Sequence, residues 1–478
     1  MLRVSEPRTD APGTALVWFR DDLRVSDNPA LRAAVDSGAE VIGLYVLDET
    51  EQASRKLGSA SRWWLHHSLK ALGASLEKRG ARLVLREGDA EEQVLDAAVE
   101  VGADHLHVNR RYAQGEREQD ERIAEEGEVH GVTTTTTAAN LLFEPGDVKN
   151  ADGEPFGVFS PFWRAAQRRG APRAPVPAPS EIRGFAGDVE SAALDDLRLL
   201  PSIDWSQGMH ETWTPGEKGA HRRLDEFVHA KLTGYTEGRD HPAADGSSRL
   251  SPHLKFGELS PFQVWHRVQQ AQHVAEGDRE KFLAELGWRE FDYGLLASTP
   301  RLEEQNVHRQ FDAFPWAEPD PAKLRAWQTG RTGIPLVDAG MRELWHTGWM
   351  HNRVRMVTAS FLIKNLRYDW RVGESWFWDC LVDADPAHNP AQWQWVAGSG
   401  ADAAPFFRIF NPVTQASKFD EAGDYVHHWV PELRGLTGKA LLEPWTAEPG
   451  AAPDYPAPIV DLKQSRQEAL DAYERMRA

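Results

Sequence analysis

Short apolar runs alternate with amphipathic patterns along the first third of the chain. The apolar runs fall at residues 15–19, 41–47, 82–86, 105–109 and 132–142. Between them, residues 29–37, 59–78 and 91–101 have the length and spacing of crossover helices. This alternation predicts an α/β domain over residues 14–143, built on a parallel doubly wound sheet.

The pattern changes twice beyond this domain. Residues 144–215 mix proline, glycine and charge, most densely at 171–180, and predict an irregular interdomain linker. Over residues 216–475 apolar side chains recur at helical spacing, as they do at Ala220, Leu224, Phe227 and Val228. The segments 282–296 and 337–366 follow the same spacing, so the second domain is expected to be all-helical.

Composition narrows the classes of protein that fit this pattern. Two domains suit a chain of 478 residues of which 41% are hydrophobic. No apolar run approaches eighteen residues and no signal-peptide pattern opens the chain, so we expect a soluble, cytoplasmic protein without a membrane partner. A monomer is also expected. The single cysteine, Cys380, excludes a disulfide framework and leaves too few thiolates for a zinc or iron–sulfur cluster, and no metal is expected.

Charge and loop motifs limit the possible partners further. The net charge of -19 argues against a general attraction to nucleic acid, so a DNA-binding surface must be a local basic patch. No Gly-x-Gly-x-x-Gly follows the first apolar run. An ordinary dinucleotide-dependent dehydrogenase is therefore disfavoured.

Tryptophan is unusually frequent, with 19 in the chain, and several stand beside charged residues in the second domain. Trp288 precedes Arg289, and Trp393 and Trp395 follow a polar run at 383–389. Packing in the core is the ordinary role of such side chains. Indole faces next to arginine also suit stacking on bases or on a flavin.

A polar turn at residues 240–251 offers a second candidate site. It carries Asp240, a Gly-Ser-Ser-Arg-Leu-Ser run at 246–251, and then a helical pattern. Its hydroxyls and backbone N–H groups could hold a pyrophosphate. Ser251 could equally serve as an ordinary helix N-cap, and the turn alone leaves both interpretations open.

Four long segments in one order closely resemble the flavin-binding half of the photolyase and cryptochrome family. They are residues 238–257 (GRDHPAADGSSRLSPHLKFG), 285–291 (ELGWREF), 348–356 (GWMHNRVRM) and 392–412 (QWQWVAGSGADAAPFFRIFNP). Residues 17–29 and 158–164 resemble the opening strand and a linker motif of the family. Within the family, the chain most resembles the class I cyclobutane pyrimidine dimer photolyases. The resemblance implies a Rossmann-like antenna-binding domain and an all-helical domain that binds FAD and the DNA lesion.

The resemblance also implies which residues bind FAD. Arg355 would pair with Asp383 beside the flavin, and Asn389 would face flavin N5, where an amide can support a reduced ring without titrating. The complete set implied to contact FAD is Tyr235, Ser247, Ser248, Arg249, Leu250, Ser251, Glu285, Asn352, Arg355, Asp383, Asp385 and Asn389.

The residues matching the lesion pocket point to DNA that contains pyrimidine dimers. Trp288 and Trp395 would form aromatic walls, Met356 an apolar contact, and Glu285 and Asn352 hydrogen bonds to the dimer. Arg239 and Arg353 match phosphate contacts, with Arg408 and Lys418 as additions. The residues implied to take part in catalysis and electron transfer are Glu285, Asn389 and the tryptophan relay of Trp393, Trp370 and Trp316.

The implied reaction is light-driven repair of cyclobutane pyrimidine dimers by an electron from excited, reduced, anionic FAD. The alternatives are a cryptochrome photoreceptor, a (6-4) photolyase, or an electron-transfer flavoprotein without a DNA role. Lys255 resembles the antenna site of 5-deazaflavin-binding relatives, and we favour that pigment over methenyltetrahydrofolate, FMN or none. Gly115 stands where folate-binding relatives carry Asn, and Gly294 stands where relatives commonly carry His.

Overall fold

The computed structural model describes residues 13–50, 53–403 and 407–477. Its N-terminal part is a five-stranded sheet in the order β3-β2-β1-β4-β5, in which every neighbouring pair is parallel. The strands are β1 (Thr14–Trp18), β2 (Glu40–Leu47), β3 (Leu83–Glu87), β4 (Ala103–Asn109) and β5 (Thr133–Thr137). The chain leaves β1 toward one side of the sheet and later returns to its other side, so the expected doubly wound topology is confirmed.

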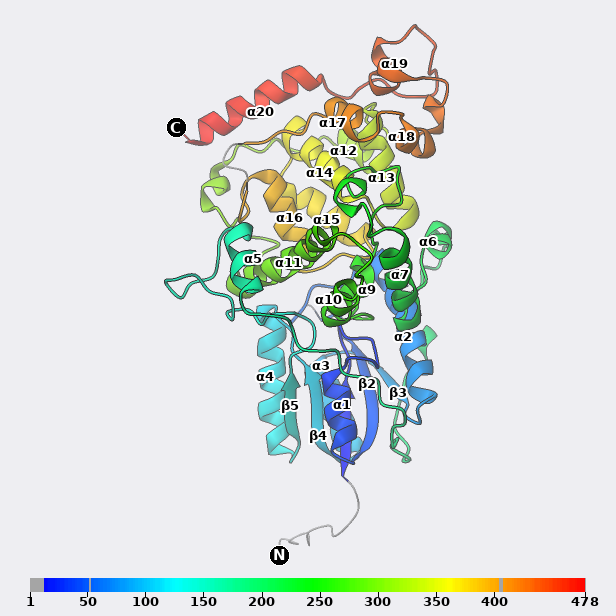
Figure 1. The fold of residues 1–478 in the computed structure, drawn as a ribbon, viewed down its shortest axis with the longest axis vertical. Helices are drawn as coiled ribbons and strands as arrows, with labels where there is room; N and C mark the ends of the chain where they lie inside the picture. Colours follow the sequence, from blue (N-terminus) through cyan, green and yellow to red (C-terminus); the bar gives the residue numbers. More distant parts are fainter. Residues whose placement is uncertain (1–12, 51–52, 404–406, 478) are drawn as a thin grey trace, which may run out of the picture.

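Four helices connect the strands: α1 (Pro29–Asp36), α2 (Ser59–Glu77), α3 (Ala90–Glu100) and α4 (Gln114–Val129). The sequence pattern did not predict α4, because charged side chains dominate it and Ile123 is its one large buried apolar residue. The last predicted strand, 132–142, was too long, since β5 ends at Thr137 and the chain continues as a loop. Figure 1 shows the carboxyl ends of the strands facing the helical domain.

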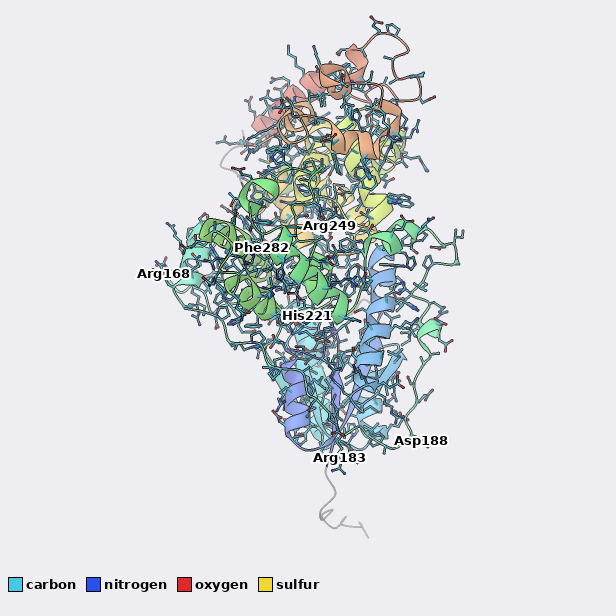
Figure 2. The ribbon with its side chains drawn as sticks, turned by 45° about the vertical axis from the view of Figure 1, so that its right-hand side comes forward. Arg168, Arg183, Asp188, His221, Arg249 and Phe282 are labelled. Atoms are coloured by element: carbon cyan, nitrogen blue, oxygen red, sulfur yellow. The ribbon has the colours of Figure 1, made fainter. Side chains whose placement is uncertain are left out.

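The segment expected to be an irregular linker contains regular structure. It forms α5 (Phe159–Gln167), a 3-10 turn at Leu194–Leu197 and α6 (Gln207–Thr212). Between these elements the linker follows the sheet, where Ile182 donates a backbone hydrogen bond to Arg79 and Phe185 donates one to Val41. Arg183 and Asp188 consequently lie near the end of the sheet that is remote from the helical domain (Figure 2).

The second domain is helical, as expected. Its helices are α7 (Glu217–Ala230), α8 (Tyr235–Gly238), α9 (Ser251–Lys255), α10 (Pro261–Gln269), α11 (Glu276–Ser298), α12 (Pro321–Gln328), α13 (Pro335–Thr347), α14 (Asn352–Ser360), α15 (Trp370–Cys380), α16 (His388–Ala397), α17 (Pro412–Phe419), α18 (Asp424–Trp429), α19 (Gly438–Leu442) and α20 (Leu462–Arg477). Short 3-10 turns lie at Arg309–Ala313, Pro431–Leu433 and Pro444–Thr446, and a π turn at Phe361–Asn365. No helix in the described ranges is long and apolar enough to cross a membrane.

The predicted helical segment 337–366 is interrupted. Gly348 ends α13 with a φ of 69°, in the left-handed region that favours glycine. A β-carbon at this position would also come within 2.8 Å of Val382 Cγ1. The chain therefore turns and restarts as α14, where the imidazole of His351 caps the new helix by accepting a hydrogen bond from Arg353 N (3.2 Å). This break turns the start of α14 toward the candidate site.

Candidate functional site

A cavity of about 470 Å³ lies among α9, α11, α14, α15 and α16. Most of the residues singled out in the sequence line it: Arg239, Ser248, Leu250, Ser251, Glu285, Trp288, Asn352, Arg355, Met356, Asp383, Asp385, Asn389, Trp393 and Trp395. Apolar side chains, among them Leu254, Phe377 and Val396, share the lining. Residues separated by more than 150 positions in the chain thus meet in one concave site of ordinary ligand-binding size.

One wall of the cavity carries a charge pair. Arg355 Nη2 donates to both carboxylate oxygens of Asp383, at 3.1 and 2.9 Å, and Arg355 Nε donates to Met350 O at 2.7 Å. Ser251 Oγ donates to the same carboxylate at 2.6 Å. The pairing of Arg355 with Asp383 is present as expected, whereas Ser251 does not cap α9 with its side chain. The fixed guanidinium and carboxylate can each orient a polar edge of a bound ligand.

Asp385 lies beside this pair in a buried hydrogen-bond network. Its carboxylate accepts bonds from Ala387 N (2.8 Å), His388 N (3.0 Å) and the hydroxyl of Tyr293 (2.8 Å). Burial raises the pKa of Asp385, but His388, Arg289 and these donors outweigh it, so the pKa lies below its usual value. The site therefore holds two carboxylates at fixed positions. Asp383 is held by its guanidinium partner, and Asp385 is held by this network.

Asn389 is anchored from behind by a residue that the sequence did not indicate. Its Nδ2 donates to Glu374 Oε1 (2.8 Å) and to Glu374 O (3.0 Å). Arg55, from the N-terminal domain, donates to both oxygens of the same carboxylate at 2.8 and 3.0 Å. With its amide nitrogen occupied in this way, Asn389 is held in a fixed orientation at the wall of the cavity that it lines.

The basic residues at the rim have acidic partners. Arg239 forms an ion pair with Glu285, which also lies 3.7 Å from Lys281. Arg353 Nη2 donates to Asp240 Oδ1 at 2.7 Å. Arg239 and Arg353, which are implied to contact DNA phosphate, therefore contact carboxylates here, and a bound phosphate would compete with these pairs.

Two tryptophans border the cavity from different helices. Trp288, on α11, stacks on Phe159 with ring centroids 3.9 Å apart and planes 8° from parallel. Trp395, on α16, donates from Nε1 to the carbonyl oxygen of Asp402 at 3.0 Å. Both indoles are half-buried and line the cavity, which is the arrangement required to stack on an inserted base.

The three residues of the expected relay share one apolar cluster. Trp393 lies edge-on to Phe377 at 4.9 Å and occupies space that a β-carbon at Gly373 would take. Trp370 is fully buried and donates from Nε1 to Asn306 Oδ1 at 2.9 Å. Trp316 packs at the edge of the cluster, so the set runs from the cavity wall through buried core to a half-buried position.

The remaining predicted residues lie around the cavity, outside its lining. Tyr235 packs against Phe227 and Phe282, and the guanidinium of Arg249 lies over Trp349. Ser247 is half-buried in the polar turn. Gly294 lines a separate cavity formed with residues 143–156, so the position at which relatives commonly carry His lies away from the candidate site.

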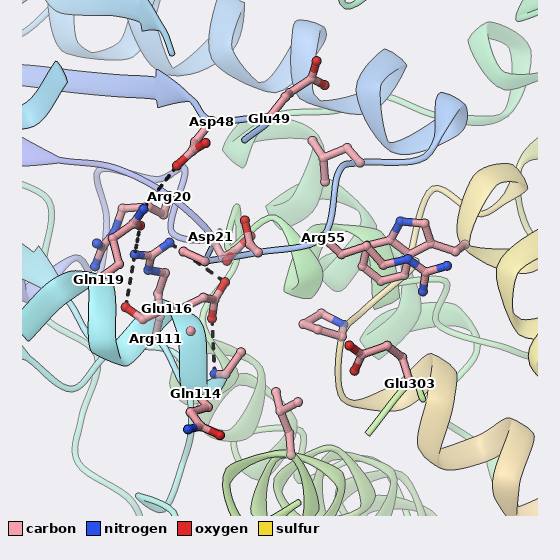
Figure 3. Close-up of a pocket in the computed structure, with 18 of the residues that line it drawn as sticks. Arg20, Asp21, Asp48, Glu49, Arg55, Arg111, Gln114, Glu116, Gln119 and Glu303 are labelled. Carbon is pink, nitrogen blue, oxygen red and sulfur yellow. Dashed lines mark hydrogen bonds and ion pairs between the residues drawn. The ribbon is translucent and has the colours of Figure 1, made fainter. Parts of the chain in front are cut away.

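A second cavity of about 970 Å³ lies between the carboxyl ends of β1 and β2 and the helical domain (Figure 3). Trp18 and Trp378 line it together with charged side chains, including Arg111, Glu116 and Lys255. Burial raises the pKa of Glu116, and the Arg111 guanidinium only partly offsets this. Lys255 also lines the first cavity, so the two cavities are neighbours.

Comparisons with known proteins match both domains. Residues 15–180 match the family model for DNA photolyase, and residues 282–475 match the FAD binding domain of DNA photolyase. The chain is 48% identical to a deoxyribodipyrimidine photo-lyase of Agrobacterium fabrum, covering 96% of this chain and 97% of that protein. It is 36% identical to cryptochrome-1 of Arabidopsis thaliana, covering 97% of this chain and 70% of that protein.

Among solved structures, a bacterial class III photolyase from Agrobacterium tumefaciens superposes with a TM-score of 0.94 at 47% identity, covering 99% of both chains. The α/β and helical fold expected from the sequence is thereby confirmed. The match is to a class III protein, so these comparisons do not support the expected placement in class I.

Proposed function

We propose, given that the chain belongs to the DNA photolyase and cryptochrome family, that it is a deoxyribodipyrimidine photolyase that uses light to reverse cyclobutane pyrimidine dimers in DNA. The proposal rests on one cavity, whose lining combines polar side chains of the kind that bind a flavin with two half-buried tryptophans. We assign antenna binding to residues 14–143, the linker to 144–215, and FAD and lesion binding to 216–475.

The residues of this cavity fit FAD. An apolar interior with fixed charges at its edge suits a flat ring system that has polar atoms along one side. Arg355, Asp383 and Asn389 would hold the ring edge, and the turn with Ser248 and Ser251 would hold the ribose and phosphate side. When bound and reduced, FAD supplies the electron that light transfers to the dimer.

The protein itself contributes by holding the polar groups of the cavity in fixed orientations. Glu374 fixes the Asn389 amide, and the Arg355 guanidinium fixes the Asp383 carboxylate, so neither group must reorganise when charge shifts nearby. Trp288 and Trp395 would receive the flipped dimer between their rings and exclude water from it. Glu285 and Asn352 would then offer hydrogen bonds to the pyrimidine edges.

We also assign Trp393, Trp370 and Trp316 to a relay that returns the flavin to its reduced state. The supporting observation is their shared apolar cluster, which keeps the indoles away from water along most of the route. Such a relay works outside the repair reaction itself. A variant that lacks it should repair normally once the flavin has been reduced chemically.

The second cavity is the proposed antenna site. Its size and its position beside the first cavity suit a second chromophore that passes excitation to FAD. Lys255 reaches this cavity and supports the 5-deazaflavin assignment, with methenyltetrahydrofolate and FMN as alternatives. Mass spectrometry of the pigment released from native protein distinguishes them, and a folate mass would contradict the assignment.

The rival function is a cryptochrome photoreceptor, which the similarity to a plant cryptochrome favours. Three matched oligonucleotides separate the possibilities: one with a cyclobutane dimer, one with a (6-4) photoproduct and one undamaged. We expect the enzyme with reduced FAD to bind the first most tightly and to convert only that lesion under blue light. Conversion of the (6-4) product, or of neither lesion, would contradict the proposal.

A further inference from the structure

Asp402 lies in the loop that follows α16 and adopts a conformation that is uncommon for a residue with a side chain. Its φ is 52°, in the left-handed region, which aspartate and asparagine tolerate better than most residues. The start of the same loop is tied to α16, because Ser399 N and Gly400 N both donate to Gln394 O. The position of Asp402 is therefore set by the helix that carries Trp395.

Two backbone hydrogen bonds connect Asp402 to opposite parts of the site. Its carbonyl oxygen accepts the Nε1–H of Trp395 at 3.0 Å. Its N–H donates to Gly157 O at 3.1 Å, in the segment just before α5. Burial raises the pKa of the Asp402 carboxyl, and the backbone N–H of Phe159 partly offsets this.

The start of α5 in turn supports the other tryptophan. Phe159 is its first residue and stacks on Trp288 at 3.9 Å. Trp163, one turn later, packs so closely on α11 that a β-carbon at Gly287 would lie 2.4 Å from its ring. The helix α5 thus holds the half-buried Trp288 from the side away from the cavity.

We propose that Gly157, Phe159 and Asp402, which we call the wall brace, are positioning residues that hold Trp288 and Trp395 at a fixed separation. The geometry forms a continuous path from Trp395 through Asp402 and Gly157 to Phe159 and Trp288. A fixed gap selects two linked pyrimidines over a single extruded base, because a looser pair of rings would stack on either. This inference rests on the proposed function of the cavity as a lesion pocket.

The test compares Asp402→Asn with Asp402→Val. Asparagine tolerates the left-handed conformation and should keep both backbone hydrogen bonds of Asp402. Valine is β-branched and strained in that conformation, so it should shift the backbone groups that bond to Trp395 and Gly157. The readout is the ratio of Kd values for undamaged and dimer-containing oligonucleotides, measured with FAD content and Tm on the same preparations.

We expect Asp402→Asn to keep the ratio of the parent protein, and Asp402→Val to lower it by about tenfold, the order of the strain that the left-handed conformation imposes on an ordinary side chain. Trp395→Phe, which removes the Nε1–H donor and keeps a smaller aromatic wall, should lower the ratio by at least as much. A purely structural role would reduce Tm in Asp402→Val and leave the ratio unchanged.

An unchanged ratio in both Asp402→Val and Trp395→Phe would overturn the brace, provided that the parent protein prefers the dimer. If the parent protein itself shows no preference, the proposed function fails and the brace fails with it as a device for specificity. The parent ratio therefore distinguishes the two failures. A lowered ratio in Asp402→Val, with the parent ratio kept in Asp402→Asn, would support the proposal.

Discussion

Replacing Trp288 by alanine tests whether the half-buried indoles bind the lesion or only pack in the core. One face of Trp288 stacks on Phe159, and the side chain also lines the cavity. If the cavity receives a flipped dimer, the substitution removes one stacking surface from the ligand. Stacking on an aromatic side chain contributes about 1–3 kcal/mol per base, so the preference for damaged DNA should fall by about 5- to 150-fold.

The cost to folding is expected to be smaller than that for a buried tryptophan. Loss of the Phe159 stack removes about 0.5–1.5 kcal/mol beyond the lost apolar area. Because the ring is half-buried, the total should remain below the roughly 3–5 kcal/mol typical of fully buried Trp→Ala changes. The variant should therefore fold and retain FAD.

The assay is competition between an irradiated and a plain oligonucleotide, with FAD absorbance and thermal unfolding recorded on the same samples. Trp429→Ala is the matched control, since this half-buried indole on α18 contacts His346 and does not line the cavity. The control should lose some stability and keep its preference for damaged DNA. A destabilised Trp288→Ala that also keeps its preference would refute the assignment of this wall and favour a photoreceptor.

The relay, the basic rim and the start of α14 can each be tested by one substitution. Trp393→Phe should abolish photoreduction of oxidised FAD and leave repair by chemically reduced protein nearly intact; unchanged photoreduction would remove Trp393 from the relay. Arg353→Ala should weaken binding to damaged and plain DNA alike and lower the slope of log K against log salt by about 1. A loss confined to damaged DNA would instead place Arg353 at the lesion. Burial lowers the pKa of His351 to about 4, so the folded protein keeps the imidazole neutral where the unfolded chain binds a proton. Stability is then lost as pH falls from 6.5 to about 4, by about 3 kcal/mol, and His351→Asn, which can still cap α14, should show a correspondingly flatter unfolding profile over this range.

Elements with strong periodicity could be predicted from the sequence, and elements with mixed surfaces could not. β1 and β2 are buried strands with continuous apolar runs, and the predicted segments agree with them to within a residue. The charged helix α4 has little apolar surface, because it covers only the edge of the sheet. Its apolar residues therefore show no helical period from which it could be predicted. The break at Gly348 depends on a close contact with Val382, which lies far along the chain.

The residues of the candidate site also divide into those that the sequence indicates and those that it does not. Motif residues such as Arg355 and Asp383 could be named because the resemblance covers their segments. Glu374 and Phe159 act through contacts with Asn389 and Trp288, and neither contact has a signal in local spacing. Ser251 has a local signal that misleads. Its position at the start of a helix predicts an N-cap, whereas its hydroxyl donates a hydrogen bond to a residue distant in the chain. Contacts between distant segments determine which side chains support the cavity.

The protein is proposed to bind pyrimidine dimers in this cavity and to repair them with light. The most direct measurement is the recovery of thymine absorbance in ultraviolet-irradiated oligo(dT) mixed with the purified protein carrying reduced FAD. We predict recovery under blue light, over many turnovers, none in darkness, and slower recovery with Trp288→Ala at limiting substrate concentration. Tight binding of the irradiated oligonucleotide with no recovery in light would contradict the account.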